Sequence, residues 1–403
     1  MSGFDELLEQ YKPQPRYDRQ EAFFADAADQ LAVNPGNQLH VGGKVMATAE
    51  TGLSLDSLGP MYKDKTKAGK DDALSIQGKD YRDQYTRLRQ SEPELNNWIY
   101  GHAKVDAQNR LWLQYWFFYF YNDYQLAGGI GLHEGDWEMV QLRMKGTADQ
   151  LGDSPEIALY AQHAYAESKS WDDVELTGDG RPVTYPGRGS HASYFAPGVY
   201  ETEGWYDIVD GGRPTPELGL KIVPDNPAGW VAWPGTWGDT RAETKGIDDP
   251  SPTGPAQHPY WDSPDKLEDK AISRKPKQPA KPPNLNAARR NGELWVMCDF
   301  RSKAAGVPLR LLATVNSREE RGVPPKTFTF DVAAKANEIG QFNTKFHLDS
   351  KKHYDVDLSI TVESGDTQLS TASRCVPLDL GVESKIPGFI KSPVWHIEQF
   401  FSH

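Results

Sequence analysis

The segment 109–123, NRLWLQYWFFYFYND, restricts the fold of this chain more than any other part of the sequence. It consists mostly of aromatic and other strand-forming residues, and both its odd and its even positions are largely apolar. A strand with two apolar faces belongs in the middle of a sheet that is covered on both sides. Its apolar part, 111–121, is too short to cross a bilayer as a helix. We therefore expect a central strand of a covered sheet.

Further strand-like segments recur between turn-rich stretches, and the 403 residues include 36 glycines and 29 prolines. Segments 136–144 and 155–163 alternate between polar and apolar residues, and 191–200 is a further candidate. Residues 204–262 are predicted to form long ordered loops with short strands, and residues 1–12 one or two helical turns. The pattern predicts an all-β protein, and the length predicts two or three domains.

A basic, proline-rich stretch at 263–290 contains almost no large apolar residues, which is typical of a semi-stiff linker. A basic arm that binds a partner is the alternative. Strand-like segments then return at regular spacing, which predicts an immunoglobulin-like β-sandwich over 291–385. They are 293–300, 307–316, 326–333, 354–363 and 370–380. We expect residues 1–262 to form a β-sandwich domain with long loops, and the aromatic tail, 386–403, to dock on the protein or contact a membrane.

Two cysteines, Cys298 and Cys375, are too few for a disulfide framework or a CxxC zinc site. They are either two reduced core thiols or one bridge across the C-terminal domain. The formal net charge of −13 argues against nucleic-acid binding, and it disfavours anionic membranes unless a cation bridges the two. The first residues lack the basic start and apolar core of a secretory signal. We expect a protein that is soluble as made in the cytoplasm and exported, if at all, by a non-standard route; its oligomeric state stays open.

Polar residues crowd the start of the segment 132–144, LHEGDWEMVQLRM. Residues two apart in a strand share a face, so Glu138 shares a face with the apolar residues at the next three alternate positions. Asp136 precedes it on the same side. A carboxylate at the edge of a core is costly unless a cation or an arginine compensates its charge. Either compensation is consistent with the spacing, whereas Glu134 is expected to face water.

Three other strand ends carry similar groups. Asp123 ends the aromatic strand, His163 ends the apolar row of 155–163, and His191 lies in the turn of GRGSHASYF. Carboxylates and imidazoles from four strand ends have the composition of a site for Mg²⁺, Ca²⁺ or Mn²⁺, ahead of Zn²⁺ or Fe²⁺. The alternatives are a satisfied core histidine at His163 and a turn-capping histidine at His191.

Familiar enzyme motifs are absent from the sequence. HEGDW differs from the zinc motif H-E-x-x-H because Trp137 occupies the position of the second histidine. Ser190 lacks the G-x-S-x-G frame of a nucleophile elbow. No Walker or dinucleotide-binding motif occurs, so spacing alone assigns no catalytic group.

Several motifs occur in an order that resembles the vacuolar protein sorting sixty-two-related family. They are PRYDRQEAFFAD, LQYWFFYFYND, HEGDWEMVQL, ALYAQH, GRGSHASYF, WPGTWGD and SPTGP, which together span about residues 13–262. This resemblance implies a fold more readily than a function. In addition, HEGDWE after FYND is similar to the heptapeptide region of necrosis- and ethylene-inducing-peptide-like cytolysins. Those proteins are lectin-like β-sandwiches in which a divalent cation helps to engage glycosylated sphingolipids.

By position, the cytolysin resemblance implies a metal site of four residues, and the strand-end pattern adds His163 and His191 as candidate further ligands. The four residues are Asp123, His133, Asp136 and Glu138. Gly135 stands where the cytolysin heptapeptide has a second histidine, and the secretory signal and N-terminal disulfide of secreted cytolysins are missing. These differences weigh against toxicity more than against metal binding.

Two functions from different classes follow. The first is recognition of a glycan or lipid head group through Mg²⁺ or Ca²⁺ (or Mn²⁺), with peripheral membrane contact and an effector or toxin activity as one outcome. Aromatic residues near the site could stack on sugars or belong to the core: Trp137, Tyr194, Trp205, Trp233 and Trp237. The second is a metal-dependent hydrolase of phosphoesters or glycans with His163 or His191 as the base. A purely structural cation is a third reading.

Overall fold

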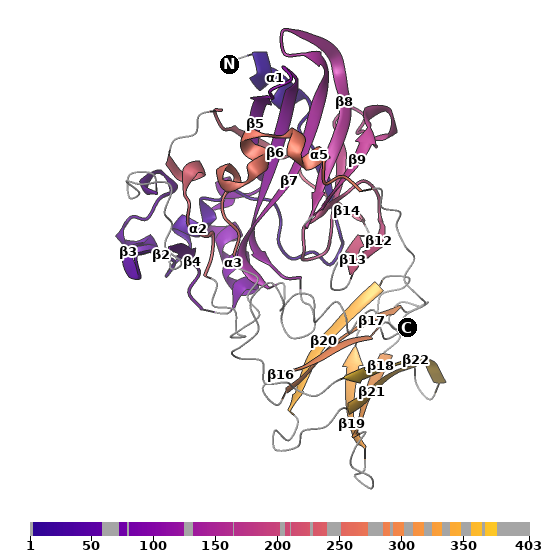
Figure 1. The fold of residues 1–403 in the computed structure, drawn as a ribbon. Coiled ribbons are helices and arrows are strands. Elements are labelled where there is room, and N and C mark those ends of the chain that lie inside the picture. Colours follow the sequence, from indigo (N-terminus) through magenta and orange to yellow (C-terminus); the bar gives the residue numbers. More distant parts are fainter. Residues whose placement is uncertain are drawn as a thin grey trace.

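The structure is a computed structural model, and strands make up most of it (Figure 1). It describes residues 3–58, 72–78, 80–124, 132–163, 165–201, 206–209, 211–225, 229–239 and 251–272, and the strands from β16 (Leu285–Arg290) to β22 (Thr367–Val376). The helices are short, so the prediction of an all-β protein is confirmed. No helix in these ranges is long and apolar enough to cross a membrane.

A six-stranded sheet forms the centre of the N-terminal part, with the order β15-β5-β6-β7-β8-β9. The strands are β15 (Gly219–Ile222), β5 (Trp98–Val105), β6 (Leu111–Asn122), β7 (His133–Thr147), β8 (Gln150–Gln162) and β9 (Tyr165–Ser170). Neighbours are antiparallel except β15 and β5, which are parallel. Every residue of β6 is buried, which confirms the predicted central strand.

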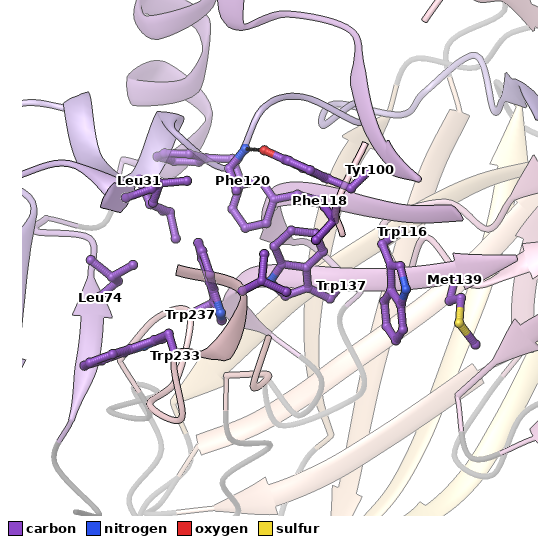
Figure 2. Close-up of a cluster of buried hydrophobic side chains, with 14 of the residues drawn as sticks. Leu31, Leu74, Tyr100, Trp116, Phe118, Phe120, Trp137, Met139, Trp233 and Trp237 are labelled. Carbon is purple, nitrogen blue, oxygen red and sulfur yellow. Dashed lines mark hydrogen bonds between the residues drawn. The ribbon is translucent and has the colours of Figure 1, made fainter. Parts of the chain in front are cut away.

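Two apolar clusters cover the two faces of this sheet, because successive residues of a strand point to opposite sides. One face, here the tryptophan face, carries Trp112, Trp116, Phe118, Trp137 and Met139. Figure 2 shows Trp237 beside Trp137 on this side, with Trp233 beyond Trp237. The other face, here the tyrosine face, carries Leu113, Tyr115, Phe117, Tyr119, Val140, Leu142 and Met144.

Smaller sheets and short helices surround the central sheet. The β-elements are β2 (Gln38–Val41), β3 (Lys44–Thr48) and β4 (Ala73–Ser75) in one sheet, β1 (Gln14–Tyr17), β10 (Val183–Pro186), β11 (Ser193–Tyr194) and β14 (Arg213–Pro214) in another, and the pair β12 (Gly198–Glu201) and β13 (Tyr206–Val209). The α-helices are α1 (Gly3–Gln10), α2 (Gln30–Val33), α3 (Tyr81–Ser91), α4 (Pro259–Asp262) and α5 (Asp265–Glu268). The 3₁₀ helices are η1 (Ala49–Thr51), η2 (Leu55–Ser57), η3 (Pro93–Leu95), η4 (Trp171–Asp173), η5 (Gly229–Ala232) and η6 (Pro255–Gln257). The helix predicted near the N-terminus is present as α1.

The start of the predicted linker packs on the central sheet. Leu267 of α5 is buried in the cluster of the tryptophan face. The buried side chain of Gln141 donates a hydrogen bond to the carbonyl oxygen of Pro264 (2.7 Å), and the backbone N–H of Ile272 donates to Ala166 (2.8 Å). Because β16 begins at residue 285, ordered elements occupy both ends of the stretch 263–290, and residues 273–284 lie outside the described ranges.

The C-terminal strands form two sheets that share one core. The orders are β16-β17-β20 and β19-β18-β21-β22, with β17 (Glu293–Arg301), β18 (Leu309–Ser317), β19 (Lys326–Val332), β20 (Ile339–His347) and β21 (Val356–Ser364). The core contains Val296, Leu311 and Ile360, which come from both sheets. All five strands expected from the sequence are present, and β16 and β20 are additional, since neither shows a clear apolar alternation. The immunoglobulin-like assignment stays a prediction.

The two cysteines lie on strands of different sheets. Cys298 is buried on β17, and Cys375 belongs to β22. The side chain of Cys375 and the tail at 386–403 lie outside the described residues, so the choice between thiols and a bridge, and the role of the tail, stay open.

Candidate functional site

Two of the predicted site residues lie side by side on the tyrosine face. Asp136 is paired across the sheet with Tyr119, and Glu138 with Phe117, both in the apolar cluster of that face. This placement confirms that Glu138 shares a face with the apolar residues that follow it. Asp136 is buried, whereas Glu138 is partly buried.

His191 lies next to Asp136 and is completely buried. Its ring stacks on that of Tyr119, with centroids 3.8 Å apart and an interplanar angle of 4°. Its Nδ1 lies 2.9 Å from Oδ2 of Asp136, and its Nε2 lies 3.6 Å from Oε1 of Glu21. The backbone of His191 is left-handed (φ 57°), and its N–H donates to the carbonyl oxygen of Gly187. The tight turn therefore directs the imidazole inward between two carboxylates.

The opposite charges of His191 and its two carboxylate neighbours stabilise one another. Burial opposes a charged imidazole, but Glu21 and Asp136 outweigh it and raise the pKa of His191 to about 9. Burial likewise opposes ionisation of Glu21, yet His191 and the backbone N–H groups of Gly189 and Phe23 lower the pKa of Glu21 below its usual range. His191 thus acts as an internal cation between the carboxyl groups of Glu21 and Asp136.

Asp207 of β13 provides a third buried carboxylate. It accepts hydrogen bonds from the hydroxyl of Tyr194 (2.5 Å) and from Nε2 of His163 (2.9 Å). Despite its burial, the contacts with His163 and Tyr194 lower the pKa of Asp207. The side chain of His163 remains 31% exposed. We call Glu21, Asp136, Glu138, Asp207 and His191 the acidic layer.

Glu138 is the exceptional member of the acidic layer. Its carboxyl group makes no hydrogen bond or ion pair with any residue in the described part of the chain. Burial, followed by the charges of Asp136 and Asp207, raises its pKa well above the usual range. Its surroundings therefore favour the protonated form of the carboxyl group.

The other two members of the predicted metal set have different partners. The carboxylate of Asp123 forms an ion pair with Arg82 of α3. Nδ1 of His133 lies 2.7 Å from the carbonyl oxygen of Gly135. Across the ranges that the structure describes, no three acidic, histidine or cysteine side chains are arranged to hold a metal ion. The structure thus divides the set. Asp136 and Glu138 belong to the acidic layer, and His133 contacts the backbone of its own strand. Asp123 pairs with Arg82, while the charges of Glu21 and His191 also act on its carboxyl group.

His163 reaches the acidic layer for a reason that differs from the predicted one. The apolar row expected to carry it, Ile157, Leu159 and Ala161, belongs to the tryptophan face and not to the face of Asp136. His163 lies just beyond the end of β8 with a left-handed backbone (φ 53°). This conformation turns the ring toward Asp207.

The expectation that Glu134 faces water is wrong. It is buried and accepts hydrogen bonds from the N–H of Ile76 (2.8 Å), the N–H of Asp239 (2.9 Å) and the hydroxyl of Tyr81 (3.1 Å). Burial outweighs these bonds and raises the pKa of Glu134 to about 7. The side chain therefore joins three separate segments at the start of β7.

The glycine beside it explains a difference from the cytolysin heptapeptide. Gly135 has a left-handed backbone (φ 58°), and a Cβ atom there would lie 1.9 Å from the carbonyl oxygen of Trp237. A histidine cannot occupy this position without displacing the segment of Trp237.

The aromatic residues considered for sugar stacking belong to the core where they are described. Trp137 and Trp237 pack edge to face, with centroids 5.3 Å apart, and both are buried (Figure 2). Trp233 and Tyr194 are also buried. Trp205 lies outside the described residues.

Two functional residues, Glu21 and Asp207, were missed by the sequence analysis. Glu21 follows no strand pattern, and its only signal was its place in the motif PRYDRQEAFFAD. Asp207 lies in a short strand within a stretch that was expected to be mainly loop. Neither position stands near Asp136 in the sequence, so only folding brings these acids together.

Comparisons with known proteins add little. No family model matches the chain, and no curated protein matches it. A family 76 glycoside hydrolase from a bovine Bacteroides thetaiotaomicron strain is a solved structure with limited similarity, at 11% identity and a TM-score of 0.20. The match covers 26% of this chain and 22% of the hydrolase. Likeness at this level carries no argument, and the two resemblances seen in the sequence stay predictions.

Proposed function

We propose that the protein recognises a glycan or a lipid head group through a divalent cation, Mg²⁺ or Ca²⁺ (or Mn²⁺), held at the Glu138 side of the acidic layer. The observation that carries the proposal is the carboxyl group of Glu138. It is partly exposed, has no partner among the described residues, and is near enough to Asp136 and Asp207 for their charges to raise its pKa.

The charge balance of the acidic layer favours this side. His191 already compensates Glu21 and Asp136, and His163 contacts Asp207. Glu138 has no such partner, so it stays neutral only by keeping its proton. A hard cation would replace that proton, and its open coordination positions suit sugar hydroxyls and phosphates. Because the protein alone offers an incomplete set of ligands here, oxygen atoms of the bound molecule would complete it.

Cation binding at Glu138 should release a proton, because the raised pKa of its carboxyl group favours the protonated form in the absence of a cation. Affinity for Mg²⁺ or Ca²⁺ is therefore expected to rise with pH. Calorimetric titrations in buffers of different ionisation enthalpy would measure the released proton. Glu138→Gln should weaken binding at least about tenfold while the protein stays folded. Glu156→Gln, at an exposed glutamate of β8, is the matched control. Equal cation affinity in Glu138→Gln and wild type would contradict the proposal.

Binding of the ligand itself is tested with a glycan array and with vesicles that contain glycosylated sphingolipids. Cation-dependent recognition is supported by retention above that on vesicles without the glycolipid, if a chelator abolishes this excess and Glu138→Gln lacks it. If neither the chelator nor Glu138→Gln changes binding to the array or this excess retention, the acidic layer is not the recognition site.

A metal-dependent hydrolase is the second candidate, and the contact between His163 and Asp207 favours it. A partly exposed imidazole oriented by a buried carboxylate is a common arrangement for a general base. His191 is unsuited to this role, since it is completely buried and already protonated. With chromogenic phosphoesters and glycosides plus Mg²⁺, Mn²⁺ or Ca²⁺, His163→Gln should lower turnover by about 10²- to 10⁴-fold. Cation-dependent binding without turnover in the wild type would exclude this candidate.

A further inference from the structure

The hairpin of β2 and β3 exposes two neighbouring apolar side chains at its tip. Val45 is 49% exposed and Met46 is 54% exposed, the largest values for large apolar residues in the described part of the chain. Residues 42–46 are all exposed. Because successive residues of a strand point to opposite sides, exposure of both shows that neither face of the tip is covered.

The tip is a defined structure that stands clear of the protein. Gly42 and Gly43 both have positive φ (58° and 75°), as a tight two-residue turn requires. No atom lies within 4 Å of a Cβ built at either glycine. The N–H of Gly42 donates to Oδ1 of Asp72 (2.6 Å), and the buried Leu39 anchors the base of the hairpin in the core. Figure 1 shows β2 and β3 at the left edge of the molecule.

The charge of the hairpin differs from that of the whole protein. The formal net charge of the chain is −13, but residues 38–49 contain no acidic side chain. Lys44 is the one lysine of this segment and directly precedes the apolar pair. A lysine beside exposed apolar residues can lie along them and place its ammonium group among lipid phosphates. Residues 38–49 themselves therefore carry no carboxylate that would oppose contact with phosphate head groups, and the carboxylate of Asp72, which accepts from Gly42, is buried.

A strand of another molecule fits this surface less well. β3 is an edge strand, which could pair with a second copy of the chain. However, the pairing of β2 and β3 shifts register between Leu39 and His40, so that Met46 is an extra residue opposite them. Such a bulge interrupts the regular hydrogen-bonding edge that a new strand needs.

We propose that this hairpin tip inserts Val45 and Met46 into the interfacial region of a lipid bilayer. Two residues at about 3.3 Å each extend about 7 Å, which matches the depth of interfacial apolar anchors. The hairpin packs on the side of the tryptophan face, whereas the acidic layer lies on the tyrosine face. The proposal is therefore independent of the cation site.

Vesicle sedimentation in the presence of a chelator measures membrane binding by the hairpin, because the chelator removes the cation that the other site needs. The wild type should bind phosphatidylcholine vesicles with and without phosphatidylserine. The double variant Val45→Glu/Met46→Glu should bind at least about tenfold more weakly. Ile222→Glu is the matched control, because Ile222 is a 41% exposed residue on another edge strand, β15.

A probe on the tip distinguishes insertion from a general loss of fold. A polarity-sensitive fluorophore on Met46→Cys should shift to the blue when vesicles are added, and the same label on Ile222→Cys should not. Unsubstituted protein treated in the same way measures labelling of the native cysteines. The proposal is overturned if wild type binds neither kind of vesicle, if the double variant binds like wild type, or if the two labels respond alike. It is equally overturned if the double variant instead changes the molecular mass in solution, which would show an interface between copies.

Discussion

Replacing His191 with glutamine should lower the free energy of unfolding by about 3 to 5 kcal/mol, as is typical when one partner of a buried ion pair is removed. The change leaves Glu21 and Asp136 buried without the cation between them. It also removes the ring that stacks on Tyr119. Chemical denaturation monitored by tryptophan fluorescence would measure the loss.

The ion pair of His191 and Glu21 should make the free energy of unfolding depend on pH. The folded pKa of His191, about 9, lies above its ordinary value of 6.5, so its contribution is complete below pH 6.5 and is lost as the pH rises through about 9. The pKa of Glu21 is lowered, so its contribution is present above 4.5 and is lost as the pH falls through its folded value. The variant His191→Gln should lack the decline in stability on the alkaline side.

A double-mutant cycle separates charge from shape. The loss of the histidine ring is the same whether residue 21 is glutamate or glutamine. The coupling free energy between His191→Gln and Glu21→Gln therefore isolates the electrostatic interaction of the two side chains. The double variant should lose less stability than the two single variants added together. Simple additivity would show that His191 does not compensate Glu21.

Replacing Gly135 with alanine should cost at least about 3 kcal/mol of unfolding free energy, through a left-handed backbone and a displaced neighbour. The new Cβ would meet the carbonyl oxygen of Trp237 at 1.9 Å, which the backbone must relieve by moving. That movement would also weaken the hydrogen bond from Asp239 to Glu134. Thermal and chemical denaturation would measure the effect.

Gly52→Ala is the matched control for this variant. Gly52 also has positive φ (89°), but no atom lies within 4 Å of its Cβ position. Gly52→Ala should lower the free energy of unfolding by only about 1 kcal/mol, which is the cost of a left-handed backbone at alanine. If both variants lose the same amount, the close approach of Trp237 contributes nothing.

The contacts of the acidic side chains restrict where a cation could bind. The residues that the cytolysin resemblance assigned to a metal are compensated in part by side chains of the protein itself, because His191 contacts Asp136 and Arg82 contacts Asp123. Of these residues, Glu138 is the one whose carboxyl group has no compensating side chain in the described part of the chain, and for that reason it carries the proposed function.

Much of the local structure could be predicted from short-range pattern. The apolar segment that forms β6 predicted a covered central strand. The alternation of side chains along a strand placed Glu138 on the same face as the apolar row of β7. These inferences succeed because strand geometry fixes the face of each residue from its neighbours. The C-terminal strands with regular alternation were found for the same reason, whereas β20 was missed.

The candidate site depended on features that no local pattern contains. His163 was expected at the site as the end of an apolar row, but that row lies on the tryptophan face, because a sequence shows alternation without showing which face it takes. Gly135 and His163 have left-handed backbones, which change the direction in which the side chains at these positions point. Glu134 moved into the interior and His163 toward Asp207 as a result.

By itself, the amino-acid sequence determined an all-β fold, its central strand and the shared face of Asp136 and Glu138, because these depend on the chemistry of neighbouring residues. Only the tertiary structure decided that Glu21, His191 and Asp207 join them, because long-range packing brings distant turns to one face of the sheet. It also decided which acids are neutralised by side chains of the protein, since compensation depends on distance in space and not on position along the chain.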